Sequence, residues 1–187
     1  RGRRPPARRR GHGRRLRMSI VVRPAEPGDA AELVALASAV GAEPEGWLLT
    51  DERWRSVGDE RRYIRAVRRS TAGAVLVAVR GDAIIGRLSI ARDPQDACAH
   101  VADLGLMVAC EHRRRGVGRA LMEAAERWAR AVGISKLELH VFPHNPAAIA
   151  LYEQMGYERE GLRRGHYRRP NGDLVDAILM AKLLTPP

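Results

Sequence analysis

The sequence predicts an α/β fold whose mixed central sheet has about seven strands and is flanked by about four helices. Strand-like and helix-like periodicities alternate along the chain in the order β α α β β β α β α β β. Two strand-like runs flank Gly81 and Asp82, a pair that favours a tight hairpin turn. A strand, a long amphipathic helix and a second strand occupy residues 101–141, and such a unit crosses over between parallel strands. The sheet should therefore be antiparallel in its first half, with a parallel pair in the middle.

In the first half of the chain, apolar residues that alternate with polar ones predict strands, and apolar residues three or four positions apart predict helices. Leu33, Leu36 and Val40 recur at helical spacing, and Gly41 ends that helix. A looser segment, 41–58, follows. The expected elements are a strand at Ser19–Arg23, helices at Pro27–Val40 and Asp59–Ser70, and strands at Ala74–Arg80, Ala83–Ala91 and Val101–Val108.

The strongest helical pattern of the chain lies in residues 116–132. We expect one apolar stripe of this helix to face the core, formed by Val117, Ala120, Leu121, Ala124, Trp128 and Ala131. After it we expect a strand at Lys136–Val141, a helix at Asn145–Met155 that ends at Gly156, and strands at Tyr157–Arg164 and Leu174–Leu184.

The net charge of +11 over 187 residues is concentrated at the beginning of the chain. Residues 1–17 contain nine arginines and no acidic residue, so the other 170 residues carry 24 basic and 22 acidic side chains. Arg, Gly and Pro supply little apolar surface, which predicts a disordered tail at 1–17 and a single domain at 18–187. The tail is either a polyanion-binding arm or a segment foreign to the native protein, and nucleic acid is an expected partner only in the first case.

Composition excludes several classes of protein. Cys98 and Cys110 cannot form a disulfide framework, and they lack the spacing of a structural zinc site. The sequence has neither an apolar run of membrane-spanning length nor a signal-peptide pattern. We expect a cytoplasmic protein that uses neither a membrane nor a metal.

An arginine- and glycine-rich loop, 110–118, separates a predicted strand from the long helix. Unpaired N–H groups at a helix start attract anions, and glycines allow positive φ angles and a close approach to phosphate. A P-loop requires a lysine, which this loop lacks. Leu121 stands where a dinucleotide fingerprint needs its third glycine. Without further information, a solvated loop is an equal alternative.

Two motifs resolve this choice. Arg113-x-x-Gly116-x-Gly118 matches the R/Q-x-x-G-x-G/A signature of the GNAT superfamily of acetyl-CoA-dependent N-acetyltransferases. Asn145 to Tyr157 resembles the N-x-x-A-x-x-L-Y-x-x-x-G-F segment of the same family, with Tyr157 in place of Phe. The motifs occur in the family's order, with a helix and a strand between them. The chain therefore resembles a GNAT acetyltransferase over most of residues 18–184.

The resemblance implies a fold and a cofactor site. The GNAT fold has a parallel strand pair that splays apart in the middle of the sheet, and the pantetheine arm of acetyl-CoA lies in the opening. Here that arm would lie along the backbone of Met107 and Val108. Asn145 matches the asparagine of the second motif, although it is also a good helix N-cap. The pyrophosphate would rest on the loop formed by Arg113, Arg114, Arg115, Gly116, Val117, Gly118 and Arg119.

The resemblance also implies direct transfer of an acetyl group to a primary amine in a ternary complex. Tyr152 matches the tyrosine that protonates the departing thiolate in many members; the alternative is a buried tyrosine with a satisfied hydroxyl. Some members carry a glutamate base five residues before the motif asparagine, and here that position is His140. His140 is therefore the candidate base, with a plain polar strand end as its alternative and with Asp103 or a water chain as other bases. Cys110 lies at the phosphate side, so we expect no acetyl-cysteine.

The resemblance further implies that the acceptor is an amine of a small molecule or a protein N-terminus, and that segments 41–64 and 163–173 bind it. An alternative function is that of a non-catalytic acyl-CoA sensor with a polyanion-binding arm. The sequence leaves open whether the protein forms a homodimer. Aromatic residues of the two segments could wall the site, and acidic ones could attract a cation or simply be solvated: Trp47, Trp54, Tyr63 and Tyr167, and Glu43, Glu45, Asp51 and Glu52.

Overall fold

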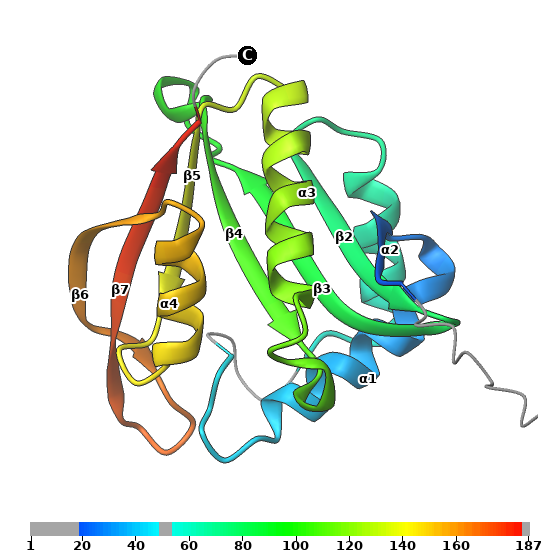
Figure 1. Ribbon diagram of the computed structural model, residues 1–187, viewed down its shortest axis with the longest axis horizontal. Helices are drawn as coiled ribbons and strands as arrows, with labels where there is room; N and C mark the ends of the chain where they lie inside the picture. Colours follow the sequence, from blue (N-terminus) through cyan, green and yellow to red (C-terminus); the bar gives the residue numbers. More distant parts are fainter. Residues whose placement is uncertain (1–18, 49–53, 185–187) are drawn as a thin grey trace, which may run out of the picture.

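The computed structural model describes residues 19–48 and 54–184, which form one seven-stranded sheet with helices on both faces (Figure 1). The strand order is β1-β2-β3-β4-β5-β7-β6. Only β4 and β5 are parallel neighbours, and every other pair is antiparallel. The fold class expected from the sequence is confirmed. No helix in these described ranges combines the length and apolar composition needed to cross a membrane.

The first half of the chain differs from the expectation mainly at helix ends. Pro27–Asp29 forms a separate 3₁₀ turn before the first α-helix. The second helix begins earlier than predicted, because the Ser56 hydroxyl accepts a hydrogen bond from the Asp59 N–H at 3.1 Å and caps it. Gly81 has the positive φ, 64°, that the tight hairpin turn needs. The elements are β1 Val21–Pro24, α1 Ala30–Gly41, α2 Val57–Val67, β2 Gly73–Arg80 and β3 Ala83–Arg92.

In the second half, the main difference is the length of β6. It continues past the predicted end at Arg164, because Gly165 adopts φ 55° and the pairing with β7 shifts between Arg163 and Tyr167. The irregularity bends the strand without ending it. The elements are β4 Val101–Val108, α3 Val117–Ala131, β5 Lys136–Val141, α4 Pro146–Gln154, β6 Glu158–Arg168 and β7 Leu174–Leu183.

Helices α3 and α4 cover one face of the sheet, which we call the α3 face, and α1 and α2 cover the other, the α1 face (Figure 1). The buried side of α3 is rotated from the predicted stripe. Ala125 and Ala129 are fully buried, whereas Trp128 is half-buried and Ala131 is exposed. Small side chains let the helix approach the sheet closely, so the large indole lies at the rim.

The parallel strands β4 and β5 stay paired over only part of their length. Cross-strand partners run from Val101 and Lys136 to Leu104 and Leu139. Beyond these residues, 105–108 of β4 pair only with β3, and 140–141 of β5 pair only with β7. The two strands therefore separate in the middle of the sheet. We call this opening the split, and it confirms the splayed pair expected from the sequence.

Candidate functional site

One edge of β4 turns unpaired backbone groups toward the split. Residues of an antiparallel strand alternate between those that bond to the neighbour and those that face away. The Ala109 N–H donates to the Ile85 carbonyl of β3 at 3.0 Å, so odd-numbered residues at this end of β4 face β3. Even-numbered residues, Leu106 and Val108, therefore face the split. Of the two residues expected along a pantetheine arm, Val108 faces the split and Met107 faces β3.

The loop before α3 carries a run of free backbone N–H groups. Within the described part of the chain, the amides of residues 114–119 donate to no acceptor, and the first helical bond joins the Ala120 N–H to the Gly116 carbonyl at 3.0 Å. These groups lie at the positive end of the helix dipole. Arg114 and Arg115 are exposed beside them. The loop can therefore bind a diphosphate.

Arg113 is already used to hold this loop in place. Its amide donates to the Cys110 carbonyl at 3.2 Å, and its Nε donates to the Val108 carbonyl at 3.0 Å. Its two terminal nitrogens each donate to Glu43 at 2.6 Å. The Glu43 carboxyl also raises the pKa of the Arg113 guanidinium. Arg113 thus fixes the loop between β4 and the α1–α2 connection, and the amides after it remain free.

The two motif glycines serve different purposes. Gly116 precedes α3 with φ 84°, a left-handed conformation that disfavours side chains. Gly118 has no positive φ; a Cβ there would lie 2.9 Å from Leu151 Cδ2 of α4, so this glycine permits close packing of α3 and α4. Arg114 has φ 60°, a conformation that the sequence did not indicate.

Helix α4 carries both candidate residues of the second motif. The Asn145 Oδ1 accepts a hydrogen bond from the Ala148 N–H at 3.1 Å, so Asn145 is the N-cap. Tyr152 is buried beside Tyr157, with ring centroids 6.1 Å apart, and its hydroxyl has no hydrogen-bond partner among the described residues. Burial raises the pKa of Tyr152 far above its usual value. The hydroxyl is therefore protonated near neutral pH and free to donate.

His140 lies at the end of β5 on the α1 face, beside the split. Its Nδ1 is 2.7 Å from the Tyr167 hydroxyl, and its ring centroid is 5.4 Å from that of His166. Burial lowers the pKa of His140, and the neighbouring Arg163 and His166 lower it further, against the opposing effect of Glu138. His140 is therefore neutral near pH 7 and can accept a proton.

Asp103, the other candidate base, lies opposite Glu138 in the paired part of β4 and β5. The residue is exposed, yet desolvation by surrounding protein atoms, together with the Glu138 charge, raises the pKa of Asp103 to about 6. The carboxylate is therefore a stronger base than an ordinary aspartate. The sequence could not show this, because it depends on a cross-strand neighbour 35 positions away.

The two segments expected to bind the acceptor meet in the structure. Arg169, after β6, donates to the Leu48 carbonyl at 2.9 Å and to the Gly46 carbonyl at 2.5 Å. Its guanidinium lies 4.4 Å from the centre of the Phe142 ring. A hollow of about 470 Å³ lies between the segments, lined by residues 41–46, Leu48, His144 and 169–171.

The aromatic residues of these segments are mostly packed against basic groups. Trp47 stacks on His144, with ring centroids 5.8 Å apart. Trp54 and Tyr63 flank Arg55, whose Nε lies 3.4 Å from the fully buried Glu60. Of the four acidic residues in these segments, Glu43 binds Arg113, and the backbone carbonyl of Glu45 accepts a hydrogen bond from the His144 ring. Asp51 and Glu52 lie outside the described residues.

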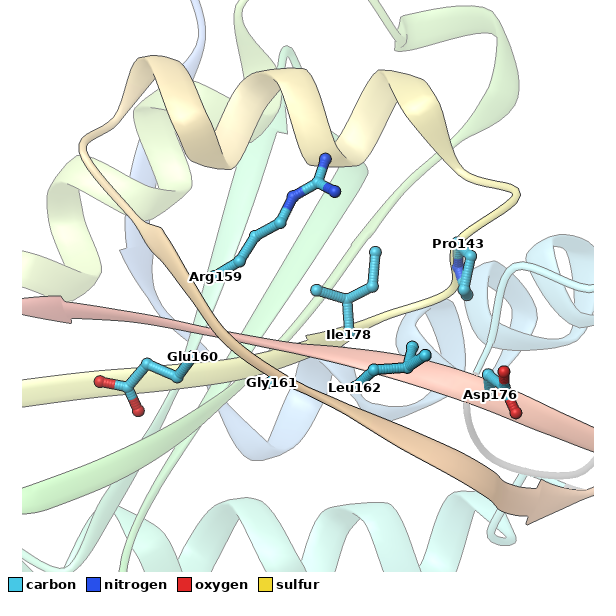
Figure 2. A pocket seen from close by; sticks show the side chains of 7 residues that line it. All are labelled: Pro143, Arg159, Glu160, Gly161, Leu162, Asp176 and Ile178. Atoms are coloured by element: carbon cyan, nitrogen blue, oxygen red, sulfur yellow. The ribbon is translucent and has the colours of Figure 1, made fainter.

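A second hollow, of about 500 Å³, lies on the α3 face between α4 and β6 (Figure 2). Its lining residues are Pro143, Arg159, Glu160, Gly161, Leu162, Asp176 and Ile178. Because His140 lies on the opposite face of the sheet, this hollow is separate from the candidate base. In residues 19–48 and 54–184, we find no group of three or more His, Cys, Asp or Glu that could hold a metal.

Comparison with known proteins agrees with this geometry. Residues 41–157 match the model of the acetyltransferase (GNAT) family. The L-amino acid N-acetyltransferase AaaT of Escherichia coli is 31% identical over 175 residues, which cover 88% of this chain and 98% of that protein. The ribosomal protein bS18 alanine N-acetyltransferase of the same species is 41% identical over 71 residues, or 38% of this chain and 47% of that protein.

Solved structures give the same fold. A GNAT acetyltransferase from Streptococcus pneumoniae superposes with a TM-score of 0.81 at 30% identity, covering 89% of this chain and all of that one. An acetyltransferase from Salmonella typhimurium, solved with its cofactor acetyl-CoA, superposes with a TM-score of 0.79 at 19% identity, covering 90% and 96% of the two chains. The sheet, the split and these matches lead to one conclusion: the chain belongs to the GNAT family and is an acetyltransferase.

Proposed function

We propose that this enzyme transfers the acetyl group of acetyl-CoA to a primary amine by direct attack in a ternary complex. The observation that carries the proposal is the split, whose open edge on β4 leads to the run of unpaired amides at 114–119. A diphosphate fits those amides, and an extended arm fits the edge as an added strand. When bound, acetyl-CoA supplies an acetyl group activated as a thioester.

The residues that would hold acetyl-CoA are mainly backbone groups. The amides of 114–119 would bind the pyrophosphate, with Arg113 fixing their loop. The N–H and carbonyl of Leu106 and the N–H of Val108, which face the split, would bind the pantetheine arm, since the Val108 carbonyl already accepts a hydrogen bond from Arg113. Met107 and Asn145 stay as predictions: Met107 lies on the same strand, and Asn145 is already engaged as an N-cap.

Tyr152 is the proposed general acid. Its hydroxyl is protonated, buried and without a partner among the described residues. It can therefore donate a proton to the sulfur of the departing thiolate. The alternative of a satisfied structural hydroxyl is not supported by any contact in the described part of the chain.

His140 is the proposed base, and Tyr167 is a positioning residue for it. If the His140 Nδ1–H donates to the Tyr167 oxygen, the lone pair of Nε2 remains free to accept the amine proton, directly or through water. Asp103 is the second candidate, because of its raised pKa. We favour His140, since it lies where β5 has left β4, whereas Asp103 lies in the paired part of the sheet.

The proposed acceptor is a primary amine of a small molecule or of a protein N-terminus. The names of the two Escherichia coli relatives support these two classes, and the match to the L-amino acid enzyme extends over nearly all of that protein. Acceptor entry from the α1 face is supported by the position of His140 and by the contact of the two predicted segments.

A direct test combines calorimetry with an activity screen. We expect the full chain to bind acetyl-CoA and to release free thiol only when a suitable amine is added. Absence of acetyl-CoA binding, or thiol release that is independent of every amine tested, would contradict the proposal. Mass spectrometry of the product would show one added acetyl group on the amine nitrogen.

A further inference from the structure

Beside the candidate base, three side chains of β6 gather on the α1 face. Residues opposite one another in an antiparallel pair share a face. Arg163 lies opposite Ala177, and His140 lies opposite Leu179, so β7 separates Arg163 from His140 on the same face. The Arg163 guanidinium donates to His166 Nε2 at 3.4 Å, and the His166 ring is 4.8 Å from that of Tyr167.

Within the described residues, neither Arg163 nor Arg164 has an acidic or carbonyl partner, unlike the other arginines in and just after β6, and Arg163 lies on the α1 face with His140. Arg159 pairs with Glu153 at 3.1 Å, and Arg168 donates to the Gly172 carbonyl at 3.2 Å. Arg169 donates to two carbonyls of the α1–α2 connection. Within the described residues, His166 is the sole hydrogen-bond partner of Arg163, and no carboxylate lies within 4 Å. Its described hydrogen-bond partner is thus an imidazole and not a carboxylate, so no acidic side chain in this part of the chain compensates the charge of the guanidinium.

The opposite side of the site is acidic. Asp103 and Glu138 lie on the same face of β4 and β5, opposite one another. Lys136 pairs with Glu138 at 2.7 Å and with Glu160 at 2.8 Å, and it forms no ion pair with Asp103. The Arg163 charge acts on three nearby groups: it opposes the desolvation that raises the pKa of Asp103 and of Tyr167, and it adds to the desolvation that lowers the pKa of His140. A ligand at His140 thus has a carboxylate on one side and an unpaired guanidinium on the other.

We propose that Arg163, oriented by His166, binds the carboxylate of the acceptor, and that the acceptor is an α-amino acid. This inference rests on the proposed function. In an α-amino acid, ammonium and carboxylate groups are attached to the same carbon, so the zwitterion matches a site with an anion and a cation on opposite sides of the base. Its nitrogen lies toward Asp103 and His140, and its carboxylate lies toward Arg163.

The same charge pattern disfavours a protein N-terminus. In a peptide, an uncharged amide replaces the α-carboxylate, so Arg163 would be desolvated without a charged partner. A hydrogen bond between charged groups contributes about 1.5–3 kcal/mol. The site should therefore distinguish an amino acid from its amide or from a dipeptide.

The first experiment compares acceptors with the full-length enzyme. Thiol release is measured with the twenty L-amino acids, and for the best of them also with its α-carboxamide, its decarboxylated amine and a dipeptide that begins with it. We expect kcat/KM for the amino acid to exceed that for each of the other three by at least tenfold. Equal or better use of the amide or dipeptide would overturn the inference while leaving acetyl transfer intact. Loss of acetyl transfer to every amine would instead refute the proposed function.

The second experiment is Arg163→Gln with Arg164→Gln as its matched control, because both variants remove one exposed arginine from the same strand. We expect Arg163→Gln to lower kcat/KM for the amino acid by about 10- to 100-fold, chiefly through KM, and to change kcat/KM for the carboxamide by less than threefold. Arg164→Gln should change neither. Equal losses for both acceptors in Arg163→Gln would indicate a structural role and overturn the inference.

Discussion

The two sides of the split are built from different parts of the chain. The proposed cofactor side consists of the end of β4 and the start of α3, within residues 105–119, and it offers backbone groups. The proposed acceptor side takes side chains from β4, β5, β6 and the α1–α2 connection, such as Asp103, His140, Tyr167 and Trp47. One side is therefore local in sequence and nearly independent of side-chain identity, and the other depends on tertiary contacts.

This difference explains how a family can keep one donor while its acceptors vary. Backbone amides at a helix start bind a diphosphate whatever side chains surround them. Side chains on β6 can change without disturbing the loop at 113–119, because Arg113 ties that loop to Glu43 and Val108 and not to β6. Changes on the two sides should thus have separable effects on donor and acceptor.

The largest effect should come from Tyr152→Phe, which removes one hydroxyl and keeps the buried ring. If Tyr152 protonates the thiolate, kcat should fall by about 10² to 10⁴, because that is the typical contribution of a general acid. Affinity for acetyl-CoA and the melting temperature should hardly change, since the hydroxyl has no partner among the described residues. Single-turnover kinetics and calorimetry on the same preparation would check both. Unchanged kcat would leave proton delivery to water.

The next effect concerns the base on the acceptor side. Neutral imidazole is the basic form, so activity should fall as the pH drops through the pKa of His140, which lies below its ordinary 6.5. His140→Gln should lower kcat/KM by about 10² and abolish this acid limb. Asp103→Asn should keep the limb. The pH at which this limb lies does not by itself distinguish His140 from Asp103 as the base, because the pKa of Asp103 is about 6 and Glu138 and His166 also face these groups.

The reverse result, a limb that persists in His140→Gln and vanishes in Asp103→Asn, would make Asp103 the base. Thermal unfolding gives an independent check on the Asp103 carboxyl. Its pKa in the folded protein is above the ordinary 3.8, so the folded state binds this proton more tightly than the unfolded state does. The parent protein should therefore lose stability as the pH rises from about 4 to about 6, and Asp103→Asn should remove that part of the loss.

The sequence predicts the cofactor side better than the acceptor side for the same physical reason. The fold, the order of elements and the loop at 113–119 follow from local periodicity and two motifs. The roles within that loop do not: the engagement of Arg113 with Glu43 spans 70 positions, and the register that turns Leu106 rather than Met107 to the split depends on β3. The backbone N–H and carbonyl groups of successive strand residues point to opposite edges of the strand, so the register with β3 identifies Leu106 as a residue that faces the split.

On the acceptor side, the sequence indicates that segments 41–64 and 163–173 meet, but not which side chains matter. The sequence suggests Tyr167 only as an aromatic residue that lines the acceptor site. Its 2.7 Å contact with His140 depends on the tertiary structure. Arg163 is one of several arginines in β6, and no local pattern shows that it lies on the same face as His140 without an acidic or carbonyl partner among the described residues. The predicted strand ends at Arg164, whereas β6 continues through Gly165, which only bends it.

The smallest effect tests whether the cofactor side is truly a matter of backbone conformation. Gly116 and Gly133 flank the two ends of α3 with φ 84° and 76°, and a Cβ at either would meet no atom within 4 Å. Alanine in this left-handed region costs about 1 kcal/mol, so Gly116→Ala and Gly133→Ala should lower the melting temperature similarly. Only Gly116 adjoins the unpaired amides at 114–119, so only its substitution should shift them. We expect Gly116→Ala to weaken acetyl-CoA binding about tenfold, corresponding to about 1.4 kcal/mol, and Gly133→Ala to leave it unchanged. Calorimetric titration of both variants with acetyl-CoA separates the two effects, because equal weakening in both would mean that helix stability, and not the conformation of the loop, governs donor binding.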